Sequence, residues 1–341
     1  MKLLIVGSDE IYSIENFYVQ YLREAGIPVE IYTAQKYFYQ YYQQSTWHKI
    51  AYLSGLSFIL PEINRGFKKV VERFQPDIIW VFKGMEIYPS SLQWAKQQGI
   101  KLINFNGDNP FIFSGRGSGN KQVSNSIGIY DRHLTYNSQV KQKMEQDYQI
   151  PTDIVPFGFD ISDKMFNEAI DQAEVNRVCF MGNPDKERGI FLQSIADAGI
   201  ALDLYGNNWT AFIKHPAVLI HEPIYGAGAW KVLRRYRVQL NLLRPHNTDT
   251  HNMRSFELGG VGGLQLAPAT RDHETFFEPG KEIFLFNSPG ECLAQISTLL
   301  AMPAAEANAC RRAARQRSIQ NGYDYRSRAR QVLQIMEEMF E

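Results

Sequence analysis

The feature that most constrains the fold is a repeated alternation of short apolar runs with longer segments of helical spacing. In the first half of the chain, the runs KLLIV, PVEIY, PDIIWVF and KLINF are rich in β-branched and aromatic residues, and helical patterns separate them. Strands that alternate with helices predict βαβ units, in which the strands lie parallel in one sheet. The sequence therefore predicts an α/β protein.

The alternation stops once and then restarts, which predicts two domains. Residues 158–176 are polar and carry no strand pattern, and the runs RVCFM, ALDLYG, VQLNLL, GLQLA and EIFLF follow them. A length of 341 residues suits two domains. We expect a first domain at 1–157, a linker at 158–176, a second domain at 177–320, and a helix within 321–341. That helix should dock through one apolar face, made of Val332, Leu333, Met336, Met339 and Phe340.

Composition argues against several classes of partner. Lysine plus arginine and aspartate plus glutamate both number 36, so no overall field would attract nucleic acid. The opening MKLLIVGSD is too short for a signal peptide, no later apolar run reaches the length of a spanning helix, and the three cysteines are widely separated. We expect a cytoplasmic protein. The simplest interpretation of the aromatic run 36–47 is a locally packed helix or lid. A membrane-facing surface is an alternative for this run, and the arginines within 311–330 could likewise contact an anionic lipid surface.

One segment, HNMRSFELGGVGG at 251–263, has the pattern of a ligand-binding helix start. Asn252 is a capping residue, Met253 and Arg254 follow in the first turn, and Glu257 lies one turn later. A helix N-terminus offers unpaired backbone N–H groups and the positive end of the helix dipole, which suit phosphate. Two pairs of glycines are expected to stop the helix and allow a tight turn beside the ligand. Taken alone, an ordinary capped helix explains the segment about as well.

Loops after three other predicted strands carry similar chemistry. Arg188 lies in a first helical turn, where a cation opposes the helix dipole unless an anion binds there. The same loops supply glycine, amide and aromatic groups: Gly182, Asn183, Asn207, Trp209 and Tyr225. Ligands of open parallel sheets bind beyond the carboxyl ends of the strands. We therefore predict an anion-binding edge in the second domain.

These segments resemble the CgeB-like (spore-maturation) glycosyltransferases, which have the GT-B fold. The matching pieces are FMGNPDKER, LDLYGNNW, LNLLRPHNTDTHNMRSFELGGVGGLQLAP, FFEPGKEIFLF and YDYRSRARQVL, with NFNGDNPF and IVPFGFD in the first half. The resemblance implies two Rossmann-like parallel-sheet domains that face a central cleft. It implies a nucleotide-sugar donor in the C-terminal domain, an acceptor in the N-terminal domain, and a C-terminal helix that crosses back to the N-terminal domain.

The resemblance also assigns roles to residues. Related retaining enzymes carry an E-x7-E pattern, whose first acid lies near the transferred sugar and whose second holds the donor ribose. Asp249 and Glu257 keep that spacing here, although the first acid is one methylene shorter. Arg188 and Arg254 are assigned to the diphosphate, where fixed cations would stabilise the leaving group. Since the chain has no Asp-x-Asp motif, we predict that neither a metal nor another cofactor is required.

The sequence defines the acceptor side and the reaction outcome less sharply. Asp108, after a predicted strand, is a candidate general base, although a structural Asp-Asn turn is the simpler explanation. A base there would give inversion, whereas Asp249 and Glu257 point to retention. His246 and His251 flank the 251–263 segment and are candidates for contact with the donor phosphate.

The predicted function is therefore metal-independent transfer, with retention favoured, of a sugar from a nucleotide-diphosphate sugar to a glycan, glycolipid or protein acceptor. A hexosyltransferase of polysaccharide biosynthesis would fit this description. Two alternatives stay open: a nucleotide-sugar epimerase of the same fold, and a catalytically silent paralogue that binds nucleotide only.

Overall fold

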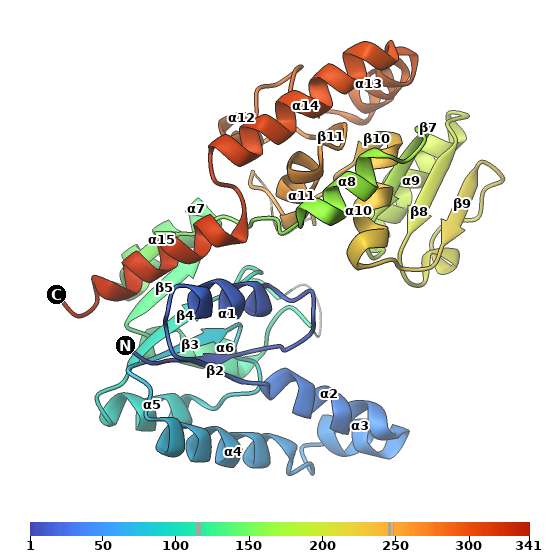
Figure 1. The fold of residues 1–341 in the computed structure, drawn as a ribbon. Helices are drawn as coiled ribbons and strands as arrows, with labels where there is room; N and C mark the ends of the chain where they lie inside the picture. The colour runs from blue at the N-terminus through green and yellow to red at the C-terminus, as the bar shows by residue number, and fades with distance from the viewer. Residues whose placement is uncertain (114–116, 245–246, 248) are drawn as a thin grey trace. The chain divides into compact units, whose positions relative to one another are not determined.

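The computed structural model describes residues 1–341 except 114–116, 245–246 and 248. The described residues form two compact units: Met1–Pro156 with Arg326–Glu341, and Phe157–Tyr325 (Figure 1). Each unit contains a six-stranded sheet in which neighbouring strands are parallel. The prediction of an α/β protein with two parallel sheets is confirmed.

The first sheet has the strand order β2-β1-β3-β4-β5-β6. Its strands are Leu3–Val6 (β1), Val29–Tyr32 (β2), Ile78–Phe82 (β3), Lys101–Phe105 (β4), Arg132–Thr135 (β5) and Thr152–Ile154 (β6). Helices α1 and α4 to α7 connect them: Ile14–Glu24 (α1), Ile59–Phe74 (α4), Pro89–Gln97 (α5), Lys121–Ser126 (α6) and Ser138–Tyr148 (α7), with the 3-10 turn Ile127–Ile129. Because β1 and β3 are buried on both faces, they are apolar throughout.

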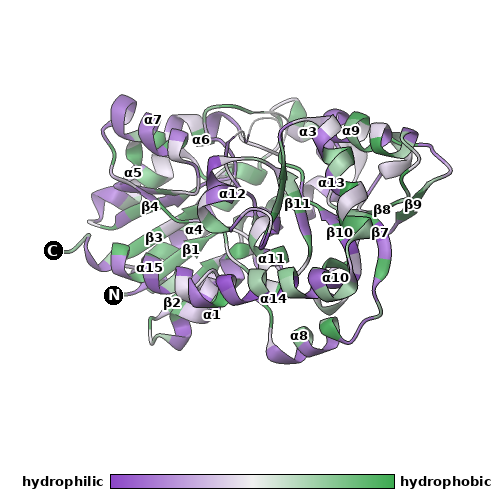
Figure 2. Cartoon of the chain, turned by 90° about the horizontal axis from the view of Figure 1, so that it is seen from above, coloured by the Kyte–Doolittle hydropathy of each residue, from purple (hydrophilic) through white to green (hydrophobic). Residues whose placement is uncertain are grey.

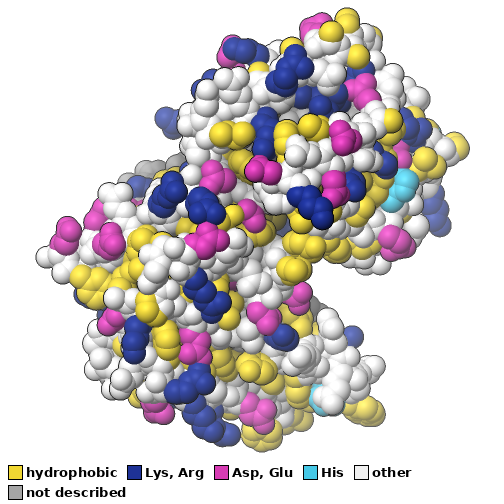
Figure 3. All heavy atoms as spheres, viewed as in Figure 1, with side chains coloured by type: hydrophobic (Ala, Val, Ile, Leu, Met, Phe, Trp, Pro, Cys, Tyr) yellow, Lys and Arg dark blue, Asp and Glu magenta, His cyan; other side chains and the backbone are white. Residues whose placement is uncertain are grey.

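The aromatic run predicted as a packed helix or lid forms two short helices, Ala34–Gln44 (α2) and Thr46–Leu53 (α3). Phe38 packs its ring against Tyr42 and Tyr52, so part of the run is packed locally. Other large side chains of this region reach the surface, and Figure 3 shows hydrophobic side chains exposed there.

The second sheet has the order β12-β11-β10-β7-β8-β9. Its strands are Val175–Met181 (β7), Leu202–Tyr205 (β8), Val218–His221 (β9), Tyr236–Leu240 (β10), Gln265–Pro268 (β11) and Phe284–Phe286 (β12). Its helices are Asp163–Ile170 (α8), Lys186–Asp197 (α9), Gly226–Arg235 (α10), Met253–Val261 (α11), Arg271–Phe276 (α12), Pro289–Ala301 (α13) and Ala304–Gln320 (α14), with a 3-10 turn at Trp209–Ala211. Figure 2 shows the buried strand β11 as largely hydrophobic, in contrast to the mostly hydrophilic α7 of the first unit.

Residues 158–176, expected as a linker, are instead part of the second unit. They contain helix α8, which begins at the cap Ser162 and packs against α10, and β7 already begins at Val175. The segment reads as polar because α8 buries only one side, around Ala169, and exposes the rest.

The last helix, Tyr325–Glu337 (α15), belongs to the first unit from Arg326 onward. Val332 and Met336 are buried as predicted, whereas Phe340 lies beyond the helix and is exposed. Arg326 pairs with Glu24 of α1 at 2.8 Å, and the Gln331 amide donates to the Ile154 carbonyl at 2.9 Å. Among the described residues, no helix is both long and apolar enough to cross a membrane.

Candidate functional site

The carboxyl edge of the second sheet holds a cavity of about 390 Å³. Its walls come from the start of α9, the loop after β10, the end of β11 and the end of β12. The lining residues are Asp185, Glu187, Arg188, Phe191, Leu242, Leu243, Arg244, Asn247, Asp249, Pro268, Ala269, Thr270 and Phe286. The cavity therefore lies at the edge where the sequence predicts an anion site.

Arg188 is a cation of this cavity that protein contacts hold in place. Its backbone N–H donates to the carboxylate of Asp185, the cap of α9, at 2.9 Å. Its guanidinium donates to the carbonyl oxygens of Asn183 (3.1 Å) and Leu242 (2.6 Å), and lies 5.5 Å from the centre of the Phe180 ring. Burial lowers the pKa of Arg188, and the Asp185 carboxylate opposes that shift. The charge is thus fixed between the ends of β7 and β10.

Asp249, predicted to lie near the transferred sugar, also lines the cavity, and its role stays a prediction. Its backbone has a φ of 52°, a left-handed conformation that is uncommon for residues other than glycine but tolerated by aspartate. Its carboxylate accepts a hydrogen bond from the Arg271 backbone N–H at 2.9 Å, at the first turn of α12. The side chain is therefore oriented by a fixed contact rather than left to rotate.

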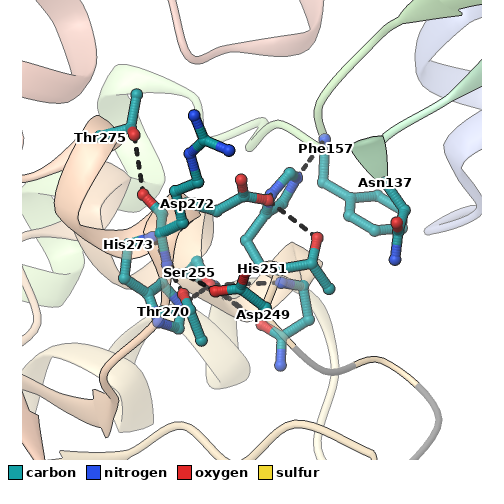
Figure 4. A network of polar contacts seen from close by, with 12 residues as sticks. Asn137, Phe157, Asp249, His251, Ser255, Thr270, Asp272, His273 and Thr275 are labelled. Carbon is teal, nitrogen blue, oxygen red and sulfur yellow. Dashed lines mark hydrogen bonds and ion pairs between the residues drawn. The ribbon is translucent and has the colours of Figure 1, made fainter. Parts of the chain in front are cut away.

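The start of α11 is held by a buried polar network (Figure 4). The Asn252 side chain accepts from the Ser255 N–H at 3.1 Å and donates to the Asn241 side chain at 2.7 Å. His273 contacts the Pro268 carbonyl through Nδ1 and the Ser255 hydroxyl through Nε2, both at 2.9 Å. Since the carbonyl only accepts, Nδ1 carries the proton and Nε2 accepts from Ser255. Burial lowers the pKa of His273 to about 4, so the ring stays neutral.

This network confirms the predicted helix cap and corrects the role of Asn252. Its side chain is committed to the capping box and to Asn241, so it positions the helix rather than offering a ligand contact. Met253 follows as the first helical residue and is partly buried.

Arg254 and Glu257, the predicted phosphate and ribose contacts, bind each other. Their side chains form an ion pair of 2.6 Å on one face of α11. Neither residue lines the cavity described above, and the Nε of Arg254 has no hydrogen-bond partner within the described part of the chain. The pair uses one nitrogen of Arg254 and one carboxylate oxygen of Glu257.

The glycines of α11 do not act as the sequence suggests. Gly259 and Gly260 lie inside the helix, and only Gly262, with a φ of 69°, ends it. A Cβ at Gly259 would lie 2.6 Å from the Ser318 hydroxyl, and one at Gly260 would lie 2.4 Å from the Phe159 ring. The first glycine pair therefore permits close packing of α11 against its neighbours rather than close approach of a ligand.

His251 does not fit the predicted contact with a donor phosphate. The side chain is 1% exposed, its Nδ1 lies 2.7 Å from the Asp272 carboxylate, and its Nε2 accepts from the Phe157 backbone N–H at 3.4 Å (Figure 4). Burial would raise the pKa of Asp272, but hydrogen bonds from His251 and Thr250 outweigh it and lower that pKa. The other flanking histidine, His246, lies outside the described residues.

Trp209 is likewise a core residue and not a ligand platform. Its ring is 0% exposed, meets Phe180 edge to face, and donates from Nε1 to the Gly182 carbonyl at 2.9 Å. It therefore fixes the loop after β7. Three other predicted donor contacts, Asn183, Asn207 and Tyr225, are exposed, and none of them lines the cavity.

The carboxyl edge of the first sheet holds the predicted base, Asp108, in an ion pair. Its carboxylate lies 2.7 Å from the Lys83 ammonium, which also donates to the Gly117 carbonyl at 2.6 Å. Lys83 has a φ of 60°, a strained conformation for a long side chain, directly after β3. Strain of this kind is often kept at functional positions.

Sequence reasoning missed two buried carboxyl groups at the same edge. Glu86 is 7% exposed, and burial raises its pKa to about 7, with Lys83 opposing and Glu15 adding to the shift. Burial also raises the pKa of Glu15, whose carboxylate accepts from the Ser8 backbone N–H at 3.0 Å. The available signal was the position of Glu86, a few residues beyond the fully apolar strand β3.

Within the part of the chain that is described, no group of three or more histidine, cysteine, aspartate or glutamate side chains is arranged to hold a metal ion. The predicted independence from metal stays a prediction.

Comparisons with known proteins agree with this architecture. Residues 188–334 match the family model described as "Glycosyl transferase-like". No curated protein matched the chain in sequence.

Similar solved structures cover nearly all of the chain at low sequence identity. Sucrose-phosphate synthase from Thermosynechococcus elongatus has a TM-score of 0.69 at 14% identity, over 100% of this chain and 99% of its own. A UDP-forming trehalose-phosphate synthase from Burkholderia xenovorans gives 0.65 at 13%, over 98% of each chain. UDP-GlcNAc 2-epimerase from Neisseria meningitidis gives 0.59 at 12%, over 99% of this chain and 100% of its own. The chain therefore has the GT-B fold, and its residues 188–334 are similar to the family described as glycosyl transferase-like.

Proposed function

We propose that the protein is a metal-independent glycosyltransferase that takes a sugar from a nucleotide-diphosphate sugar. One observation carries the proposal: Arg188 is fixed by protein contacts at a cavity on the carboxyl edge of the second sheet, inside the family-matched segment. Loss of a diphosphate leaving group builds negative charge on phosphate oxygen, and a preorganised cation there lowers the barrier. Arg244, which lines the same cavity, adds a second positive charge.

In this proposal Asp249 lies beside the transferred sugar and Glu257 holds the donor ribose, as in retaining relatives. Arg254 then contacts the diphosphate, and the ion pair between Arg254 and Glu257 opens when the donor binds. The family resemblance to CgeB-like enzymes supports these roles, and the orientation of Asp249 toward the cavity favours its part.

For the acceptor side we propose the carboxyl edge of the first sheet. For the inverting outcome, which is the alternative to the retaining roles of Asp249 and Glu257, Glu86 is a stronger candidate base than Asp108, because a group with a pKa near 7 can both accept and release a proton at neutral pH. The acceptor is a glycan, a glycolipid or a protein.

The exposed face of α2, α3 and the following loop supports peripheral membrane contact. Trp47 is 78% exposed, and Leu56 and Phe58 are also exposed. From residue 34 to residue 61 the sequence contains no acidic residue. Tryptophan and phenylalanine without nearby acids favour a lipid interface. A blue shift of Trp47 fluorescence on adding phosphatidylcholine vesicles, absent in Trp47→Phe, would support this contact, and an unchanged spectrum would oppose it.

The test of the activity has two stages. A panel of nucleotide-diphosphate sugars, screened by thermal shift in the presence of a chelator, should reveal a stabilising donor. That donor is then incubated with the protein and candidate acceptors, and the products are analysed by mass spectrometry and NMR. A new glycoside together with free nucleoside diphosphate supports transfer, whereas donor binding without any product supports the silent paralogue.

An epimerase is the second candidate function, because UDP-GlcNAc 2-epimerases are among the similar structures. An epimerase would convert the donor into an isomeric nucleotide sugar without an acceptor. That product would contradict the proposed transferase activity.

A further inference from the structure

The amino edge of the second sheet holds a larger cavity, of about 900 Å³. It lies among α8, the end of α10 and α14, at the segments that enter β7, β10 and β11. Glu174 immediately precedes β7, Arg235 precedes β10, and Gly262 leads toward β11. Donor-type ligands of parallel sheets bind at the opposite, carboxyl edge, so the proposed activity gives this cavity no role.

Five arginines line this cavity: Arg234, Arg235, Arg311, Arg312 and Arg315. Glu174 is the one acid among the lining residues, and it is already paired with Arg311 at 2.5 Å and with Arg237. Like charges held close together destabilise the folded state unless an anion joins them. In Figure 3, Lys and Arg side chains gather with hydrophobic ones on the surface over α14.

Three of these arginines are fixed by protein contacts and form the wall. Arg311 donates to the Tyr236 carbonyl at 3.2 Å in addition to its pair with Glu174. Arg235 donates to the Tyr205 hydroxyl at 3.0 Å. The guanidinium of Arg315 lies 3.6 Å from the centre of the Phe166 ring.

The other two arginines, Arg234 and Arg312, are not held in place by protein contacts of this kind. The guanidinium groups of Arg234 and Arg312 make no hydrogen bond or ion pair with any described residue. Arg234 is partly buried, and burial followed by repulsion from Arg311 lowers its pKa to about 10. The Nε atoms of Arg235 and Arg311 are buried and have no hydrogen-bond partner within the described residues. The guanidinium donors of Arg234 and Arg312 suit an anion with several oxygens.

Apolar side chains form the rest of the wall. A ligand of this cavity should therefore carry an apolar group in addition to its negative charge. Phe166 and Val261 line the cavity, and Ile170 and Ile319 are exposed at it. A free phosphate ion would leave these side chains without contacts, whereas an ester with an apolar group would cover them.

We propose that this cavity binds a phosphate ester whose phosphate contacts Arg234 and Arg312 and whose apolar group lies against Phe166 and Ile319. The ligand is either a soluble ester or the headgroup of an anionic lipid, because both present the same chemistry. The site is separate from the cavity that contains Arg188.

The test measures binding of phenyl phosphate by calorimetry. The double variant Arg234→Gln/Arg312→Gln should bind about tenfold more weakly or worse, because two charge-assisted hydrogen bonds are lost. Arg65→Gln, which removes an exposed charge from α4, is the matched control and should change nothing. Ile319→Ser should reduce the preference for phenyl phosphate over inorganic phosphate.

Arg188→Gln separates this site from the proposed donor site. It should leave phenyl phosphate binding unchanged while it weakens nucleoside diphosphate binding, so the two proposals can fail independently. Phenyl phosphate binding that is lost in Arg188→Gln and kept in the double variant would overturn the inference.

Vesicles distinguish the two sources of the ester. Co-sedimentation with phosphatidylcholine vesicles containing phosphatidic acid, lost in the double variant, assigns a lipid headgroup. Phenyl phosphate binding without co-sedimentation assigns a soluble ester. If the double variant affects neither ligand, the cavity is not a phosphate-ester site.

Discussion

The carboxyl edges of the two sheets are built on the same scaffold but carry opposite chemistry. Each edge terminates parallel strands of a six-stranded sheet. In the second unit the cavity is lined by Arg188 and Arg244 together with three carboxylates, and the neutral ring of His273 holds the nearby helix. In the first unit the edge contains the buried carboxyls Glu15 and Glu86. The second edge thus combines fixed cations with carboxylates, whereas the first edge holds carboxyl groups whose pKa values are raised by burial.

The difference teaches that the parallel sheet fixes where a site lies, while a few loop residues decide what it binds. Both edges contain titratable groups kept away from water, where charge interactions are stronger. Burial raises the pKa of Glu86 and lowers that of His273, so each group tends toward its neutral form. The two edges should therefore respond in opposite ways to pH.

The largest expected effect on the free energy of unfolding comes from substitution of Glu86. Its folded pKa of about 7 lies above the ordinary value of 4.5, so its contribution to stability is present below pH 4.5 and is lost as pH rises through 7. Glu86→Gln should therefore raise the free energy of unfolding at pH 8 by up to about 3 kcal/mol, and change it little at pH 4. Urea denaturation at the two pH values measures this. A variant less stable than the wild type at pH 8 would contradict the assignment.

A similar effect of opposite direction is expected at His273. Its folded pKa of about 4 lies below the ordinary value of 6.5, so the stability it contributes is present above pH 6.5 and is lost as pH falls through 4. The advantage of the wild type over His273→Gln should shrink by up to about 3 kcal/mol over that range. Denaturation curves at pH 7 and pH 4 test it. An advantage that stays constant would show that the ring does not titrate as expected.

The smallest expected effect is on the ion pair of Asp108. Asp108→Asn removes the charge 2.7 Å from Lys83, but Lys83 keeps its bond to the Gly117 carbonyl. Partly exposed ion pairs contribute little, so the free energy of unfolding should fall by less than about 1 kcal/mol. Thermal unfolding in low and high salt checks this. A loss of several kcal/mol would mean that the pair, and not burial, organises the first edge.

The sequence predicted the sheets and the location of the second edge because both follow from local patterns. Alternating apolar runs predicted the parallel strands, and the cap at Asn252 predicted the start of α11. The linker prediction failed because α8 buries a single narrow face. Loop side chains were harder to predict, since their exposure depends on contacts with distant residues.

Trp209 and His251 illustrate that limit. Both types of residue are common in binding sites. Here, however, Trp209 donates a hydrogen bond to Gly182, and His251 contacts Asp272. In each pair the two residues are more than 20 positions apart in the sequence. Glu86 was missed for the converse reason: its position after the apolar strand β3 was visible in the sequence, but its burial depends on how other segments pack around it. Burial follows from packing, which composition and spacing describe only in part.

The most direct test of the central claim is calorimetry of nucleoside diphosphate binding, with a chelator present, in two neighbouring variants. Arg188→Gln removes the fixed cation, and Lys186→Gln removes an exposed one from the same helical turn. We predict that the first weakens binding by about 30-fold, or about 2 kcal/mol, while the second leaves it within about twofold. Equal affinities in both variants, or binding that the chelator abolishes, would contradict a metal-free anion site at this edge.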